Sequence, residues 1–285
     1  MPDQGINPQL QIQHDLVHAV MEYADLWRRI TGEWRASSTG NQVWLSYSAN
    51  YLVSSSGYKW ALDPFAMSAR VANLPAPDYQ ADLAPLSLVL LTHEHNDHLD
   101  MALFKALSDL EIQWVIPGYL QGKIVREAAL PSHRVITPVP GEWITTGPLR
   151  VLPFESLHMR VSHGVPETGY LVEHENMRWL FPGDIRNFDI TRLHDFGRLD
   201  AAVAHIWLGK AHALDECPPL LNDFCEFFTW FQTERLIITH MNEFGRNETE
   251  LWRKEHYELA KSEILRRRPG MRVEKALMGD RFDLG

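Results

Sequence analysis

The sequence has few cysteines and no long apolar run. Cys217 and Cys225 are the two thiols in 285 residues, and they lie eight apart in a region that reads as the start of a helix. Two thiols are too few for a disulfide framework, and the residues beside them indicate that the thiols pack against other side chains and have no chemical role. No apolar stretch approaches the roughly 18 residues of a membrane-spanning helix, and residues 1–5 are polar. We therefore expect neither a membrane span nor a signal peptide, and a cytoplasmic location.

Linkers and an excess of positive charge are also lacking. No Pro-, Gly- or Ser-rich tract, low-complexity segment or repeat divides the chain, which is long enough to bury a full two-layer core. The formal net charge is -10, whereas general nucleic-acid or anionic-membrane binders need a positive field. The one concentrated basic run, 266–268, ends a helical pattern whose dipole it complements. We expect a small-molecule substrate and no nucleic acid, and a homo-oligomer stays open.

Side chains that could bind a metal are concentrated in residues 92–100, which have the sequence THEHNDHLD. The apolar run 86–91 before them predicts a buried strand, and helical spacing after them predicts a helix, so the stretch forms a strand-to-helix turn. His93 and His95 point the same way in an extended segment and can bind one cation, while the turn brings Asp97 and His98 beside them. Alternatively, Asp97 caps the helix, and Asp100 also suits its first turn.

The string 93–98, HEHNDH, resembles the signature motif of the metallo-β-lactamase superfamily. The longer string 92–100 resembles the branch that contains ascorbate-phosphate lactonases and N-acyl-phosphatidylethanolamine phospholipase D. This resemblance implies an α/β fold, a four-layer αββα sandwich with a one- or two-metal hydrolytic centre. It covers residues 43–285, the expected hydrolase domain. Residues 1–42 then form a helical extension packed on that domain, with a lid or a dimer surface as alternatives.

Further ligands are expected at the ends of later strands. His158 and His163 both compete to complete the site of His93 and His95, and the arrangement around 157–160 is similar to that of the superfamily, which favours His158. Asp184 follows a glycine in a turn that matches the superfamily's bridging aspartate. His240 follows the apolar strand 235–239 and resembles the last ligand position.

Several residues around these ligands are candidates for supporting roles. Asp63, in an Asp-Pro pair that closes an early strand, either orients a metal-binding histidine or caps a turn. Lys210 could neutralise a phosphate or carboxylate and His212 could donate to an oxyanion, although solvated loop residues are the alternative. His163 lines the pocket or stays solvated. The branch usually has Thr or Ser where Ile185 stands, so the hydroxyl of that position is missing here.

Periodicity predicts the remaining elements as strands and helices in the order of a sheet covered by helices. An amphipathic helix is expected at 12–34 and a long helix at 251–265. The expected strands are 43–47, 51–53, 58–62, 112–116, 134–137, 149–160, 169–172, 177–181, 200–209, 235–239 and 272–277. His205, inside one of these strands, reads as a core histidine with its hydrogen bonds satisfied.

By resemblance, His93, His95 and His158 hold one metal, Asp97, His98 and His240 hold a second, and Asp184 bridges them. The implied cofactors are two divalent metal ions, Zn²⁺ first, with Mn²⁺ or Fe²⁺ as alternatives. A hydroxide held between the metals would attack a small phosphodiester or a lactone or other ester, and catalytic Asp97 would orient it or receive a proton. A nuclease of the same superfamily, and a non-catalytic metal-dependent binding or regulatory protein, are the alternatives.

Overall fold

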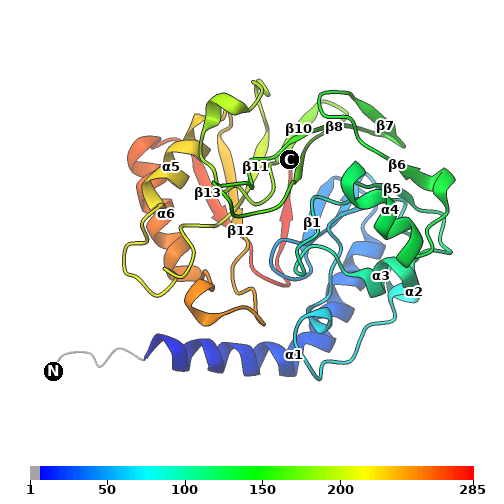
Figure 1. Cartoon of the computed structure of the whole chain (residues 1–285), viewed down its shortest axis with the longest axis horizontal. Helices are drawn as coiled ribbons and strands as arrows, with labels where there is room; N and C mark the ends of the chain where they lie inside the picture. The colour runs from blue at the N-terminus through cyan, green and yellow to red at the C-terminus, as the bar shows by residue number, and fades with distance from the viewer. Residues whose placement is uncertain (1–6) are drawn as a thin grey trace.

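Two facing β-sheets with helices on their outer sides make up the molecule (Figure 1). The computed structural model describes residues 7–285, so the first six residues of the predicted 1–42 extension lie outside the described residues. The predicted four-layer αββα sandwich with an N-terminal helix is confirmed. Among residues 7–285, no helix has both the length and the apolar character needed to cross a membrane.

The first sheet has the strand order β14-β1-β2-β3-β4-β5-β6. Its strands are β1 (Asn41–Leu45), β2 (Tyr51–Ser55), β3 (Tyr58–Leu62), β4 (Leu88–Leu90), β5 (Gln113–Val115), β6 (Val135–Ile136) and β14 (Arg281–Asp283). β3 to β6 run parallel, and β1 and β2 are antiparallel to their neighbours. The helices α1 (Pro8–Ala36), α2 (Tyr79–Asp82), α3 (Met101–Ala106) and α4 (Gly118–Glu127) belong to this half.

The second sheet has the order β13-β12-β11-β10-β9-β8-β7. Its strands are β7 (Ile144–Thr146), β8 (Leu149–Glu155), β9 (Thr168–His174), β10 (Met177–Phe181), β11 (Ala201–His205), β12 (Arg235–Thr239) and β13 (Arg272–Lys275). β10 to β13 run parallel. The helices α5 (Leu221–Trp230) and α6 (Lys254–Arg267) pack on its outer face and on each other.

Apolar side chains that alternate along the strands fill the space between the sheets. Val53, Leu90 and Val203 are fully buried there, together with the ring of Trp179. Because side chains of a strand point alternately to its two faces, the other face of each sheet is free to receive its helices. The two outer helical layers therefore have hydrophobic clusters of their own.

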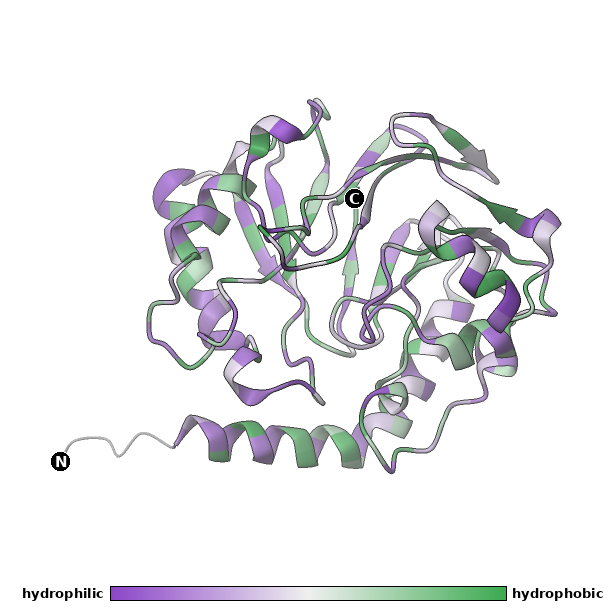
Figure 2. Cartoon of the chain, viewed as in Figure 1, coloured by the Kyte–Doolittle hydropathy of each residue, from purple (hydrophilic) through white to green (hydrophobic). Residues whose placement is uncertain are grey.

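The N-terminal helix is longer than its periodicity predicts. Asn7 caps α1 with its side chain and Pro8 occupies the first turn, so the helix begins before residue 12. Figure 2 shows hydrophobic and hydrophilic residues alternating along it. The indole Nε1 of Trp34 donates a 2.9 Å hydrogen bond to the carbonyl of Val53 in β2, which fixes the helix on the first sheet. The division of the chain at residue 43 stays a prediction.

The ends of the strands place the loops of interest on one edge of the sandwich. In a parallel sheet the carboxyl ends meet at a single edge, and the loops there hold ligands. The turns after β3 and β4 leave the first sheet at this edge, and those after β8, β10 and β12 leave the second. β8 ends at Glu155, so His158 lies in the loop beyond it and not within the predicted strand 149–160.

Candidate metal centre

The turn after β4 carries four of the predicted side chains. His93, Asp97 and His98 are buried in it, and His95 is partly exposed. The side chain of Asn50 holds the turn in place, because its Nδ2 donates a 2.8 Å hydrogen bond to the carbonyl oxygen of Asp97. A turn that is pinned by a buried amide presents its side chains in one fixed arrangement.

Asp100 caps the helix that follows this turn. Its Oδ1 accepts a 3.0 Å hydrogen bond from the backbone N–H of Leu103 in the first turn of α3. The alternative that Asp97 serves as this cap is therefore wrong. The Asp97 carboxylate lies instead 3.3 Å from Nε2 of His240, which follows β12 in the other sheet.

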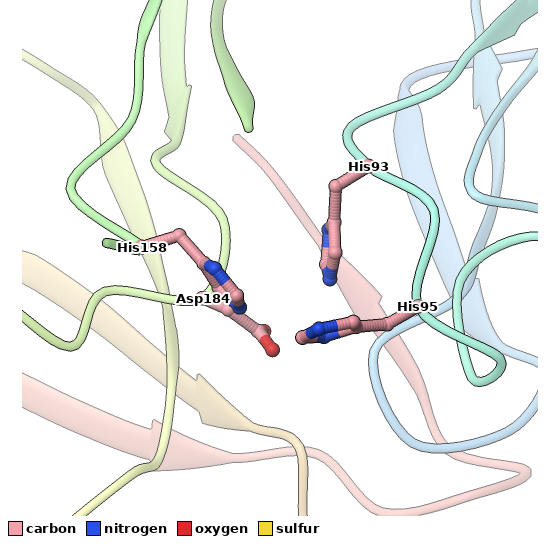
Figure 3. Close-up of side chains that lie close together, drawn as sticks. All are labelled: His93, His95, His158 and Asp184. Carbon is pink, nitrogen blue, oxygen red and sulfur yellow. The ribbon is translucent and has the colours of Figure 1, made fainter. Parts of the chain in front are cut away.

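One group of potential ligands joins both halves of the sandwich. His93 and His95 from the turn after β4 face His158 and Asp184 from the second sheet, and one ligand atom from each lies within 4.8 Å of the others. Figure 3 shows the four side chains converging on one point. His163, the competing candidate, is exposed and pairs with Arg160 in a short bridge, outside this group.

A second group shares Asp184 with the first. It consists of Asp97, His98, Asp184 and His240, all buried and again within 4.8 Å of one another. Nε2 of His98 lies 3.6 Å from both Asp97 Oδ2 and Asp184 Oδ1, and Nε2 of His240 lies 3.6 Å from Asp184 Oδ1. Ligands at the corners of a tetrahedron around zinc are about 3.3 Å apart. The observed separations are therefore close to those of ligands around one cation.

The buried ring nitrogens have the chemistry that a metal site requires. Within residues 7–285, Nε2 of His93, His98, His158 and His240 has no hydrogen-bond partner although each atom is buried. A buried polar atom without a partner costs free energy, so most are paired in folded proteins. Four such nitrogens beside the shared carboxylate of Asp184 are best satisfied by cations, because each then uses its lone pair as a ligand.

Asp63 holds one of these histidines from behind. Its Oδ2 lies 2.7 Å from Nδ1 of His98, and its Oδ1 accepts a 2.7 Å hydrogen bond from the backbone N–H of Thr92. A carboxylate on Nδ1 fixes the ring and leaves Nε2 free. His205 is buried with both ring nitrogens paired, Nδ1 with Asp184 at 2.8 Å and Nε2 with the hydroxyl of Tyr51 at 2.8 Å.

Glu167, which the sequence patterns did not single out, occupies the corresponding position behind the first group. Its Oε1 lies 2.9 Å from Nδ1 of His93. Both of its oxygens accept 3.0 Å contacts from the backbone N–H of Asp184, and Oε2 accepts a 2.8 Å hydrogen bond from Ser156. One buried carboxylate thus holds a ligand histidine and the shared aspartate together. No motif marks it, because it lies just before β9, whereas its partners follow β4 and β10.

The family model of the beta-lactamase superfamily domain matches residues 61–241, more than half of the chain. The chain belongs to this superfamily. The match spans the turn after β4, His158, Asp184 and His240. No curated protein matches the sequence at a significant level.

Solved structures share the superfamily fold over most of the chain. Igni18, a metallo hydrolase from the archaeon Ignicoccus hospitalis, has a TM-score of 0.62 at 15% identity over 86% of this chain and 98% of its own. An isothiocyanate hydrolase from Delia radicum gut bacteria has a TM-score of 0.59 at 17% identity over 85% and 98%. CmlA, a diiron β-hydroxylase from Streptomyces venezuelae, has a TM-score of 0.59 at 14% identity over 86% and 54%. At such identities the similarity shows the fold.

Burial keeps the first group of superfamily histidines neutral. Desolvation, followed by the neighbouring imidazoles, lowers the pKa of His93 and of His95 to about 3. Desolvation also lowers the pKa of His158 to about 4. A neutral imidazole has the free lone pair that a metal requires. These three side chains therefore need not lose a proton to bind a cation at neutral pH.

The second group carries a concentrated negative field. The pKa of His98 is raised to about 10, because Asp184 and Asp97 outweigh the opposing effect of its burial. The pKa values of both aspartates lie well below the usual range, since the nearby imidazoles outweigh desolvation. The field that holds a proton on His98 is the field that would attract a divalent cation.

Two left-handed backbone positions shape the site. Gly183 has a φ of 82°, and a Cβ there would lie 2.4 Å from Oε1 of Glu167. His240 has a φ of 66°, which is uncommon for a residue with a side chain, and its N–H donates a 2.8 Å hydrogen bond to the carbonyl of Ser48. Ile185 packs in the apolar cluster of the second sheet, where the branch would have a hydroxyl.

A small cavity of about 220 Å³ opens beside His95 and Asp97. Of the predicted contacts, Lys210 lines this cavity, and its Nζ lies 3.8 Å from Glu250. His212 is exposed, does not line the cavity, and pairs with Asp215 at 3.0 Å. The structure thus brings the seven predicted ligands and Lys210 together, and leaves His163 and His212 at the surface.

Proposed function

We propose that the chain is a hydrolase that depends on two divalent metal ions, with zinc as the leading candidate. The shared position of Asp184 in both ligand groups carries this proposal. His93, His95 and His158 would hold one ion. Asp97, His98 and His240 would hold the other ion, and Asp184 would bind both. The unpartnered Nε2 atoms of the buried histidines support the same assignment.

Ions held there would supply a water molecule of lowered pKa and would polarise an oxygen of the substrate. The protein's own contribution is to position these groups and to receive protons. Asp97 is the candidate that orients the attacking water or takes up its proton, because it lines the cavity. The guanidinium of Arg70 lies 3.4 Å from Oδ1 of Asp97 and fixes the direction of that carboxylate.

We place the substrate among small phosphodiesters, lactones and other esters, as the resemblance of residues 92–100 to the lactonase and phospholipase D branch implies. The cavity of about 220 Å³ is at the small end for ligand pockets. The net charge of -10 disfavours a nuclease, because a nucleic-acid channel is lined by Lys and Arg.

A substrate panel tests the proposal. Protein loaded in parallel with Zn²⁺, Mn²⁺ or Fe²⁺ is assayed with an activated phosphodiester, a lactone, an anilide and, because one solved structure of this fold is an isothiocyanate hydrolase, an isothiocyanate. We expect turnover of the phosphodiester or the lactone, lost by about 100-fold or more in Asp184→Asn. Asp109→Asn, an exposed carboxylate after α3, is the matched control and should match the wild type.

Each alternative has its own outcome in this design. Salt-sensitive binding and cleavage of RNA or single-stranded DNA would favour a nuclease. Stoichiometric metal with no turnover of any class, together with no change in Asp184→Asn, would favour a metal-dependent binding or regulatory protein.

A further inference from the structure

The cavity beside the metal centre has basic walls. Arg70, Arg186, Lys210 and Arg246 line it, together with the carboxylates Asp97, Glu243 and Glu250. These cations are not equally free to meet a ligand, because buried acids already neutralise some of them. Their existing partners decide which one a substrate can use.

Glu243 and Glu250 pair with Arg70 and Arg246, whereas Lys210 is largely exposed and makes only a long contact with Glu250. Nη2 of Arg70 lies 2.9 Å from Glu243 Oε1, and Nη1 of Arg246 lies 2.5 Å from Glu243 Oε2. Nε of Arg246 also pairs with Glu250 at 3.2 Å, and the Nζ of Lys210 lies 3.8 Å from the same residue. Because the buried Glu243 pairs with both, Arg70 and Arg246 are less free to bind a ligand.

Arg186 differs from these residues. Its Nε, like that of Arg70, is buried without a hydrogen-bond partner among residues 7–285, but its ion pair, from Nη2 to Asp184 Oδ2, is long at 3.9 Å, whereas Nη2 of Arg70 pairs with Glu243 at 2.9 Å. The side chain is 14% exposed. A guanidinium that is mostly desolvated and leaves donors unused costs free energy that a bound acceptor would recover.

The position of this guanidinium is fixed. Its central carbon lies over the ring of Trp207, 5.5 Å from the ring centroid. The backbone N–H of Arg186 donates to the carbonyl of Leu157 at 3.0 Å, and its own carbonyl accepts a 3.3 Å hydrogen bond from Arg160. A guanidinium that contacts an aromatic ring and extends from an anchored backbone is pre-organised to bind the two oxygens of a planar or tetrahedral anion.

We infer that Arg186 is a specificity-determining residue that binds an oxyanion of the substrate, a carboxylate or a phosphate, with Trp207 holding the guanidinium and Lys210 adding charge at the rim. This inference rests on the proposed function. Since Arg186 lies beside the carboxylate shared by both ligand groups, the bound oxyanion lies next to the bond that is cut. The preferred substrate is thus a small anion and not a neutral ester.

Direct binding tests this without turnover. Zinc-loaded wild type and Arg186→Gln are titrated calorimetrically with inorganic phosphate and, in a separate arm, with acetate, and metal content is measured in both proteins. We expect Arg186→Gln to weaken binding of one or both anions by about 10- to 100-fold with metal content unchanged, because a charge-assisted pair is lost. The arm with the larger loss identifies phosphate or carboxylate. Arg126→Gln, exposed on α4, is the matched control.

Kinetics provide the second measurement. A lactone that carries a free carboxylate is compared with its methyl ester. In Arg186→Gln, the KM for the acid should rise by about 10-fold or more while the values for the ester stay unchanged. Equal affinities of wild type and Arg186→Gln for both anions would overturn the inference and leave the proposed hydrolase standing. Loss of metal binding by the wild type would overturn the proposed function, while the calorimetric comparison in metal-free protein would still test Arg186.

Discussion

At the scale of single residues, two buried acids each contact one of the candidate metal-binding histidines. Asp63 holds His98 at 2.7 Å, and Glu167 holds His93 at 2.9 Å. Each acid contacts Nδ1, so each fixes the ring with Nε2 directed into the site. The imidazoles are therefore arranged before any cation binds.

Replacing Glu167 with Gln tests this arrangement. The change keeps the volume of the side chain but removes the negative charge that accepts from His93 and from the backbone of Asp184. We expect zinc affinity to fall by about 10- to 100-fold while the chain stays folded. Competition with a chromophoric chelator measures the affinity. Glu155→Gln, an 80% exposed acid on β8, is the control, and equal affinities for both variants would refute a positioning role.

The two cysteines should differ sharply in reactivity. Cys225 is fully buried in α5, and desolvation raises the pKa of its thiol to about 12, whereas Cys217 is exposed. Because the thiolate is the reactive form, an aromatic disulfide reagent should label one thiol quickly in the native protein and the second after unfolding. Cys217→Ser should remove the fast phase. Two fast thiols in the native protein would contradict the burial of Cys225.

At the scale of elements, the turn after β10 carries Asp184, which belongs to both groups of candidate ligands. Gly183 has a positive φ and leaves no room for a side chain beside Glu167. The turn places Asp184 where it can reach both groups of ligands. Glycine is required there by backbone conformation and by space together.

Gly183→Ala should lower the free energy of unfolding by about 1–3 kcal/mol and weaken metal binding, because Glu167 must move away. Guanidinium unfolding of metal-free protein measures the first effect. Gly122→Ala in α4 is the control, since a Cβ there meets nothing within 4 Å, and it should raise stability by about 0.5–1 kcal/mol. Equal stabilities of Gly183→Ala and the wild type would argue against this steric and backbone requirement for glycine.

The local patterns predicted most elements, and the long-range contacts explain what they missed. The strands that precede His93 and His240 are apolar runs whose burial is legible in the sequence. β14 was not predicted, because Arg281–Asp283 is short and partly exposed and forms only by pairing with β1. Glu167 was missed for a similar reason, since only the folded chain brings it to His93 and Asp184.

The resemblance to a family predicted candidate site residues that periodicity alone could not predict. His158 and His163 both follow β8, and the sequence alone left the choice between them open. The structure brings His158 into the first group and leaves His163 exposed in the hairpin. Neither charge nor spacing distinguished Arg186 from other arginines, because its long ion pair and its contact with the ring of Trp207 exist only in the fold.

At the scale of the whole molecule, the site lies where the two halves of the sandwich meet. His93, His95, Asp97 and His98 come from the first sheet, while His158, Asp184 and His240 come from the second. The last strand, β14, returns from the second half to pair with β1 in the first. Cations bound between the halves would link them, so metal should stabilise the whole fold and not one loop.

The metal content of the purified protein tests the central claim most directly. Protein produced in metal-replete medium and dialysed against metal-free buffer is analysed by inductively coupled plasma mass spectrometry. We predict two equivalents of a divalent metal per chain in the wild type, and fewer than one in Asp184→Ala, because that carboxylate belongs to both ligand groups. A wild-type value of one or zero, or two equivalents retained in Asp184→Ala, would contradict a pair of cations that share Asp184.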